Sequence, residues 1–494
     1  MANLYLGKAK EKYFLRTDKI NQHGIISGAT GSGKTVTLKV LCEELSLKGV
    51  PTFLTDVKGD LLNLCQAGQM NDNIKKRLEV LGEENFEFTN FPVNLWDVYQ
   101  EEGINLRISI SELGPLLLSQ ILDLNDTQEG VINILFRIAD EKGLLLLDLK
   151  DLNSMLTFLN ENSNEYSNKY GNISSTSVAA IKRKLLVLEE EGGDKFFGEP
   201  SIDIRDFLQT DSEGKGYINI LNSKKLINSP KLYSIFLIYL FTELFQNLAE
   251  VGNPELPKAV FFFDEAHLLF ENINKTLLDK ITTVVKLIRS KGVGIFFISQ
   301  NPLDIPDQIS SQLSTKIIHQ LRAFSPKEAK ALKEISETLR ENPDFETKEE
   351  LNSLATGVAL VSSLDEKGIP RQIEKVTIRP PHSSFQILSS NDIDFLVKNS
   401  KFYDKYQKGI DRESAYEILQ AKLLEKEEEE AKVKEAEEKR LRQKEEEKIR
   451  REEEKKRSKD MRYINKGIDS MLGTISRTVG REIARGILGS LRKR

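Results

Sequence analysis

The chain has 494 residues, with 71 Lys and Arg against 76 Asp and Glu, and a formal net charge of -5. That length is enough for a substantial buried core, and the charge balance excludes a protein that coats nucleic acid through uniform basicity. The charge is uneven, because the last 34 residues carry about +6 and the preceding 460 about -11. Cys42 and Cys65 match neither a disulfide framework nor a zinc site, and the N-terminus lacks the apolar core of a signal peptide, so we predict a cytoplasmic location.

Residues 1–100 are predicted to form the first part of an α/β core. A short apolar run, "HGIISG", is followed by a helical pattern from Lys34 to about Lys48, then by "VPTFLTDVKGD" and a polar helix at "NDNIKKRLEVLG". Alternation of short β-rich runs with helical patterns is typical of a parallel sheet with crossover helices.

The next two regions divide the chain further. Residues 101–215 are rich in helical patterns and polar loops, which predicts an inserted helical subdomain. Residues 216–385 return to strand patterns, among them "KAVFFFDEAH", "GVGIFFISQ" and "TKIIHQL", and are predicted to complete the α/β core. The expected fold class is α/β, with a mainly parallel, doubly wound sheet.

The last two regions are predicted to be helical. Residues 386–460 include a stretch dense in Glu, Lys and Arg at i, i+4 spacing, which favours a long charged helix over a coiled coil, with a disordered spacer as the alternative. Residues 461–494 form a basic amphipathic segment with Arg477, Arg481 and Arg485 on one side. Such a segment can be an ordinary docking helix, or can contact a membrane surface, an acidic partner or DNA.

The stretch "GATGSGKT" fits the P-loop pattern G-x-x-x-x-G-K-[ST] between a predicted strand and a predicted helix. Its backbone N–H groups are expected to face the phosphates of ATP. Lys34 is expected to reach the β- and γ-phosphates, and Thr35 to bind Mg²⁺. The predicted nucleotide-binding residues are Gly28, Ala29, Thr30, Gly31, Ser32, Gly33, Lys34 and Thr35.

A second strand supplies the acids that such a site needs. Asp264 follows the apolar run of "KAVFFFDEAH" and is predicted to organise the Mg²⁺, while Glu265 is predicted to polarise the attacking water. A capping Asp-Glu pair is the alternative interpretation. Gln300 ends the next apolar strand, where its amide can sense the γ-phosphate, whereas Arg289 precedes that strand and is placed to serve a neighbouring subunit.

Together, "GATGSGKT", "DVKGD", "FFFDEAH" and "RSKGVGIFFISQNP" resemble the HerA/FtsK superfamily of ring-forming P-loop ATPases, and more narrowly the stand-alone, YjgR-like HerA helicase C-terminal family. The resemblance implies a RecA-like core, homo-hexamers with ATP and Mg²⁺ at subunit interfaces, and movement along double-stranded DNA. It places Gln300 at the sensor position and Arg289 at an interface arginine, with Arg322 as a second candidate. Asp56 and Lys58 match a strand-end D-x-K whose implied role is structural or interfacial.

Three functions remain open from the sequence. The first is an ATP-hydrolysing ring motor that acts as a DNA translocase or helicase-like ATPase. The second is an ATPase that remodels or delivers an unknown protein partner, at the membrane surface or elsewhere, without moving DNA. The third is a nucleotide-gated scaffold with slow turnover, which the presence of Glu265 disfavours.

Overall fold

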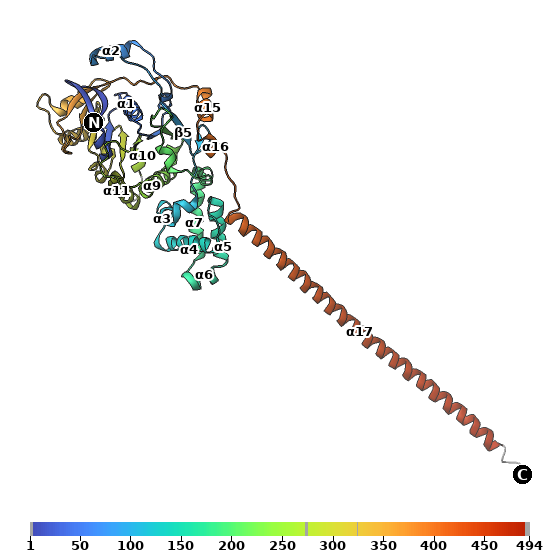
Figure 1. Cartoon of the computed structure of the whole chain (residues 1–494). Coiled ribbons are helices and arrows are strands. Elements are labelled where there is room, and N and C mark those ends of the chain that lie inside the picture. The colour runs from blue at the N-terminus through green and yellow to red at the C-terminus, as the bar shows by residue number, and fades with distance from the viewer. Residues whose placement is uncertain (1–2, 272–274, 324, 490–494) are drawn as a thin grey trace. The chain divides into compact units, whose positions relative to one another are not determined.

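The structure, a computed structural model, describes residues 3–271, 275–323 and 325–489 (Figure 1). One compact unit ends at Ile418, and a second begins at Leu419. The first unit contains a 12-stranded sheet in the order β2-β1-β12-β11-β10-β3-β9-β8-β4-β7-β5-β6.

Neighbouring strands from β10 to β6 pair in parallel. These strands are β10 (Thr315–Ile318), β3 (Gly24–Ser27), β9 (Val293–Ser299), β8 (Ala259–Phe263), β4 (Thr52–Asp56), β7 (Ile218–Asn222), β5 (Val93–Asp97) and β6 (Ile104–Asn105). Every residue of β3, β4, β8 and β9 is buried, as expected for parallel strands covered on both faces. The predicted mainly parallel α/β sheet is therefore confirmed.

Four antiparallel strands extend the sheet beyond β10. They are β11 (Val358–Ser362), β12 (Glu374–Ile378), β1 (Asn3–Lys8) and β2 (Lys12–Arg16). The last two, β1 and β2, were not predicted from the sequence. Both strands are short and are separated by a charged segment, and β1 is held in the sheet by pairing with β12, more than 360 residues away along the chain.

The first unit contains two sets of helices. Those near the sheet and in its connections are α1 (Lys34–Leu47), α2 (Asp72–Leu81), α8 (Asp194–Phe196), α9 (Pro230–Asn247), α10 (His267–Phe270), α11 (Lys275–Ile288), α12 (Asp307–Ser310), α13 (Pro326–Glu337), α14 (Thr347–Ser353), α15 (Ser390–Lys398) and α16 (Tyr403–Tyr406). Between β6 and β7, a group of helices lies side by side in Figure 1: α3 (Ile110–Ile121), α4 (Asp126–Lys142), α5 (Leu149–Glu161), α6 (Ser163–Tyr170) and α7 (Ser175–Leu188). They occupy the interval of the predicted helical subdomain, whose boundaries stay a prediction.

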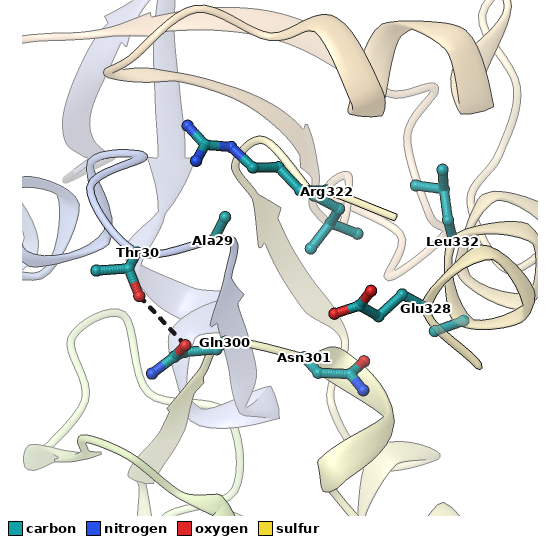
Figure 2. A pocket seen from close by; sticks show the side chains of 9 residues that line it. Ala29, Thr30, Gln300, Asn301, Arg322, Glu328 and Leu332 are labelled. Atoms are coloured by element: carbon teal, nitrogen blue, oxygen red, sulfur yellow. Dashed lines mark hydrogen bonds between the residues drawn. The ribbon is translucent and has the colours of Figure 1, made fainter. Parts of the chain in front are cut away.

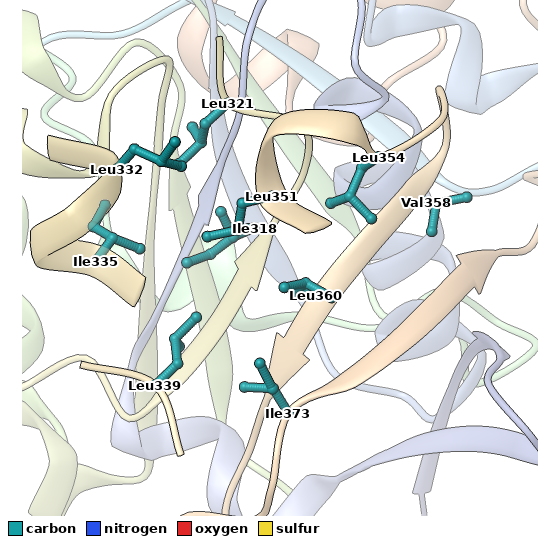
Figure 3. Packing of buried hydrophobic residues seen from close by; sticks show 10 residues of the cluster. All are labelled: Ile318, Leu321, Leu332, Ile335, Leu339, Leu351, Leu354, Val358, Leu360 and Ile373. Atoms are coloured by element: carbon teal, nitrogen blue, oxygen red, sulfur yellow. The ribbon is translucent and has the colours of Figure 1, made fainter. Parts of the chain in front are cut away.

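A compact apolar cluster fixes α13 and α14 against β10 and β11 (Figure 3). Its members are Ile318, Leu321, Leu332, Ile335, Leu339, Leu351, Leu354, Val358, Leu360 and Ile373. Because close packing of these side chains leaves the surrounding backbone little freedom, the cluster holds the segment that follows β10 in place.

After β12 the chain folds back onto the first part of the core. Buried Arg379 donates a hydrogen bond to Glu43 of α1, and Glu43 also accepts from the backbone N–H groups of His382 and Ser383. Further along, Phe402 packs against Trp96 of β5, with ring centroids 5.5 Å apart. The end of the first unit is thereby attached both to the helix that follows the P-loop and to a distant strand of the sheet.

The second unit is the greater part of one helix, α17 (Ala415–Gly489), which is 75 residues long. Every side chain from residue 420 to 480 is exposed. Ion pairs at i, i+4 spacing occur along it, such as Lys439–Glu435 at 2.7 Å. The predicted long charged helix is confirmed, and it continues into the predicted 461–494 segment; Arg481 and Arg485 of that segment lie outside the residues whose side chains are described. Within the described ranges, no helix has the length and apolar character needed to cross a bilayer.

Candidate nucleotide site

Polar side chains gather where four neighbouring parallel strands end. Ser27 of β3 pairs with Ser299 of β9, and Phe263 of β8 pairs with Phe297 of β9 and with Thr55 of β4. The carboxyl ends of these strands therefore coincide at one edge of the sheet. Ligands of open α/β sheets bind at this edge, so the segments that follow the four strands form the candidate site.

The P-loop joins β3 to α1 and is shaped by its glycines. Gly33 has φ 118°, and a Cβ atom there would lie 3.0 Å from the backbone of Gly357, so only glycine fits without strain. Lys34 begins α1, and its ammonium donates hydrogen bonds to the carbonyls of Gly28 at 2.6 Å and Ala29 at 3.2 Å. Burial lowers the pKa of Lys34. The Oγ of Ser32 is buried without a hydrogen-bond partner among the described residues, as expected of a loop whose polar atoms serve a ligand.

His319 packs against the P-loop, a role that was not predicted from the sequence. Its Nδ1 lies 3.0 Å from the carbonyl of Val358 and its Nε2 2.8 Å from the hydroxyl of Thr37 in α1. Since a carbonyl only accepts, Nδ1 carries the proton and Nε2 accepts from Thr37. Burial lowers the pKa of His319 to about 4, so the ring is neutral near pH 7. A lone His after "TKII" carries no signal that would reveal this contact.

Asp264 and Glu265 follow β8 directly. The backbone N–H of Asp264 donates to the hydroxyl of Thr55 at 2.9 Å, which ties the end of β8 to β4. Burial, together with the adjacent charge of Glu265, raises the pKa of Asp264 to about 7. Glu265 has the left-handed φ of 47°, and the next N–H, of Ala266, donates to Ile298 of β9. This turn fixes the direction in which the Glu265 side chain leaves the strand.

Lys58 contacts Glu265, and the sequence had not predicted this pairing. Asp56 accepts hydrogen bonds from the N–H groups of Lys58, Gly59 and Leu61, which folds the loop after β4 into a tight turn. From that turn, Lys58 Nζ lies 3.0 Å from Glu265 Oε1. Burial by itself raises the pKa of Glu265, but the hydrogen bond and charge of Lys58 outweigh it and hold the pKa below its usual value.

Gln300 joins the P-loop to Glu265, as Figure 2 shows for its contact with Thr30. The hydroxyl of Thr30 donates to Gln300 Oε1 at 3.2 Å, and Gln300 Nε2 lies 3.4 Å from both carboxylate oxygens of Glu265. Each end of the amide thus has a distinct partner, which fixes its orientation. A polar side chain at the end of a fully buried strand is explained by these two contacts.

The two predicted arginines lie in different places. Arg322 follows β10 and lines a cavity of about 300 Å³ with Thr30 and Gln300; in Figure 2 its guanidinium reaches toward the P-loop. Arg289 is exposed and precedes the seven-residue strand β9 that ends before Gln300, a span of roughly 20 Å at about 3.3 Å per residue. The structure therefore brings Arg322, but not Arg289, to the site of its own chain.

The oxygens at this edge suit a magnesium ion. Thr35 offers a hydroxyl at the start of α1, and Asp264 a carboxylate at the end of β8. Hydroxyl, carboxylate and phosphate oxygens are the ligands that Mg²⁺ prefers, and the ion usually keeps several waters, so one carboxylate is sufficient. The donor set of Thr35 and Asp264 fits Mg²⁺ beside a nucleotide.

Comparison with known proteins identifies a matching family and several relatives. The sequence profile of the family described as "Helicase HerA-like C-terminal" matches residues 3–494. The chain is 24% identical over 368 residues to the DNA double-strand break repair helicase HerA of Sulfolobus acidocaldarius, and 25% identical over 357 residues to that of Sulfurisphaera tokodaii. In each case the match covers 70% of this chain and 63% of the relative, so the chain spans less than two thirds of those proteins.

Among solved structures, the plasmid coupling protein TrwB in complex with the non-hydrolysable GTP analogue GDPNP matches with a TM-score of 0.50 and 14% identity. The match covers 75% of this chain and 90% of TrwB. At that identity the likeness concerns the fold alone, and it confirms the predicted RecA-like P-loop architecture.

Proposed function

Because the chain belongs to the Helicase HerA-like C-terminal family, we propose that it hydrolyses ATP with Mg²⁺ and uses the energy to move DNA as a homo-oligomeric ring, with a hexamer as the expected size. The observation that carries the proposal is the meeting of Lys34, Glu265 and Gln300 at the ends of three neighbouring strands, β3, β8 and β9. Binding of a phosphate chain alone requires the P-loop, whereas hydrolysis also requires an acid placed to activate water.

Each residue of the site has its own role in the proposed reaction. Lys34 exchanges its two carbonyl acceptors for phosphate oxygens when the nucleotide binds. Glu265, kept ionised by Lys58, accepts the proton of the attacking water. The Gln300 amide connects the P-loop to Glu265 through its contacts with Thr30 and Glu265, and it can sense whether the γ-phosphate is present. A bound Mg²⁺, held by Thr35 and Asp264, would neutralise charge on the phosphate oxygens.

The DNA part of the proposal is supported by the printed names of the Sulfolobus and Sulfurisphaera relatives. A chain with a net charge of -5 needs a local basic lining to contact the phosphate backbone. Such contacts position a motor on DNA without reading its sequence.

The proposal of a ring is supported by the position of Arg289. This residue is exposed and precedes β9, at the opposite end of that strand from the P-loop of its own chain. We expect Arg289 to complete the site of a neighbouring subunit. Arg289→Ala subunits mixed with wild-type subunits should reduce ATP hydrolysis beyond their mole fraction, and Arg183→Ala, at another exposed position, is the control. Loss in strict proportion to the mutant fraction would show that Arg289 does not act in trans.

The experiment that tests the whole proposal is steady-state ATP hydrolysis with and without long double-stranded DNA, at low and moderate salt, with Glu265→Gln as the blank. Several-fold stimulation that weakens with salt supports a DNA motor. Hydrolysis that is indifferent to DNA supports instead an ATPase that remodels a protein partner. Helix α17, whose side chains from residue 420 to 480 are exposed, favours that second candidate, since a helix of this length can contact a partner or a membrane surface.

A further inference from the structure

Two cavities flank the P-loop, and the proposed reaction uses only one of them. The first, of about 300 Å³, adjoins Thr30 and Gln300. The second, of about 340 Å³, begins at Gly33 and Val36 and continues between α2 and the segment after β12. The two cavities share no lining residue.

The position of the acid fixes the direction of a bound nucleotide. Glu265 and Gln300 adjoin the Thr30 side of the P-loop, so the γ-phosphate must face that side for its water to reach Glu265. A triphosphate that lies along the loop then directs its nucleoside toward the opposite end of the loop. That end is the Gly33 and Val36 side, where the second cavity opens.

We propose that the second cavity binds the purine base of the nucleotide, an inference that rests on the proposed ATPase function. Its walls include Val36, Ile74, Ile378 and Pro380, which offer apolar contact to a flat ring. Phe385 also lines it and is 49% exposed, so part of its ring is accessible to a ligand. An aromatic ring open on one side can stack with a base, and such stacking is tolerant of which base is bound.

The cavity wall is attached to the P-loop. Arg77 of α2 donates hydrogen bonds to the carbonyls of Thr356 at 2.8 Å and Gly357 at 3.2 Å, which fixes α2 beside the turn that precedes β11. Gly357 in turn is the residue against which Gly33 packs. A base in the cavity would therefore contact the same elements that hold the phosphate cradle.

A contact with a buried lysine also fixes the position of the Phe385 ring. The ammonium of Lys39, in α1, lies 5.2 Å from the centroid of the Phe385 ring. Lys39 is buried and donates to Asn63 at 2.7 Å, so the cation has a fixed position and can hold the ring by a cation–π contact. Phe385 is thus placed in advance of binding, which limits the ordering cost of stacking.

The test compares a ligand that carries a nucleoside on its chain of three phosphorus groups with a ligand that is such a chain alone. The dissociation constants of a non-hydrolysable ATP analogue and of inorganic tripolyphosphate are measured with Mg²⁺ on the full chain. The wild type should bind the analogue at least about tenfold more tightly, the range expected when one base stacks on an aromatic ring. Phe385→Ala should remove most of that difference and leave tripolyphosphate binding within about twofold, whereas Phe385→Trp should preserve the difference.

Two further variants keep the test decisive. Val36→Trp, which fills the cavity from α1, should also weaken the analogue selectively, and Phe395→Ala, at a phenylalanine that is 71% exposed on α15, should change neither ligand. Equal wild-type affinities for the two ligands, or a preference that survives both Phe385→Ala and Val36→Trp, would overturn the base site. If Phe385→Ala weakened both ligands alike, its role would be structural and the inference wrong. Failure of the wild type to bind either ligand would instead overturn the proposed ATPase function.

Discussion

The distances within the ion pairs Arg379–Glu43 and Lys439–Glu435 do not reflect how much each pair contributes to the stability of the fold. The first joins groups 3.4 Å apart whose side chains are 1% and 0% exposed, and the second joins groups 2.7 Å apart that are 71% and 67% exposed. Water screens the shorter pair almost completely, whereas the longer pair joins two buried charges, and loss of one of them would leave the other without part of its compensation in a place that water does not reach. The pair with the longer contact is therefore the one that the fold depends on.

The same contrast holds for the two regions that contain these pairs. At the nucleotide edge, two functional side chains are fixed by residues remote in sequence: Glu265 by Lys58, and Gln300 by Thr30. Along the described part of α17, ion pairs join positions four apart. A local change is absorbed locally in the helix, whereas at the sheet edge it reaches elements far along the chain.

The largest effect is expected where the remote contacts meet the chemistry. Glu265→Gln should lower the turnover of ATP by at least about 100-fold, because it removes the general base, and should leave nucleotide binding nearly unchanged. Single-turnover hydrolysis and equilibrium binding measure the two quantities. Glu271→Gln, at a nearby exposed acid, is the control, and full hydrolysis by the Glu265→Gln protein would exclude Glu265 from the mechanism.

The buried pair should dominate stability. Glu43→Gln should lower the free energy of unfolding by about 3–5 kcal/mol, because it leaves Arg379 short of a buried partner and weakens the bonds that Glu43 accepts from His382 and Ser383. Urea denaturation checks this value. A loss below about 1 kcal/mol would mean that Glu44, which also contacts Arg379, is sufficient alone.

Removal of the Lys58 charge should produce an intermediate effect. Lys58→Met should lower turnover about tenfold, equivalent to about 1.4 kcal/mol, while Lys58→Arg should recover most of it and the affinity for nucleotide should change little. The recovery separates a role in holding Glu265 from a role in folding the loop. Lys286→Met, at an exposed lysine of α11, controls for loss of surface charge, and unchanged turnover in Lys58→Met would show that the contact is incidental.

The smallest effect is expected on α17. Glu435→Gln should cost about 0.3–0.5 kcal/mol of local helix stability and leave both ATP turnover and the unfolding of the first unit unchanged. Hydrogen exchange around residue 435, at low and high salt, measures the local change. If unfolding of the sheet shifted as well, the separation between the two regions would be wrong.

The sequence predicted those features that depend on local pattern. The P-loop, the acids after β8, the parallel strands and the charged helix each have a motif or a periodicity that can be read within about 20 residues. The contacts of Lys58 with Glu265 and of His319 with Thr37 join residues more than 200 positions apart, and no local pattern encodes them. Strand β1 was missed for the same reason, since it is placed by its pairing with β12, and β2 joins the sheet through β1.

The left-handed backbone of Glu265, at φ 47°, also affects how this chain can change. A side chain in that conformation costs on the order of 1–3 kcal/mol, and glycine would relieve it. Selection for heat resistance alone would therefore favour Glu265→Gly, a substitution that also removes the acid. We expect libraries screened only for thermal tolerance to accumulate inactive variants at this position, so that such screens need activity as a second criterion.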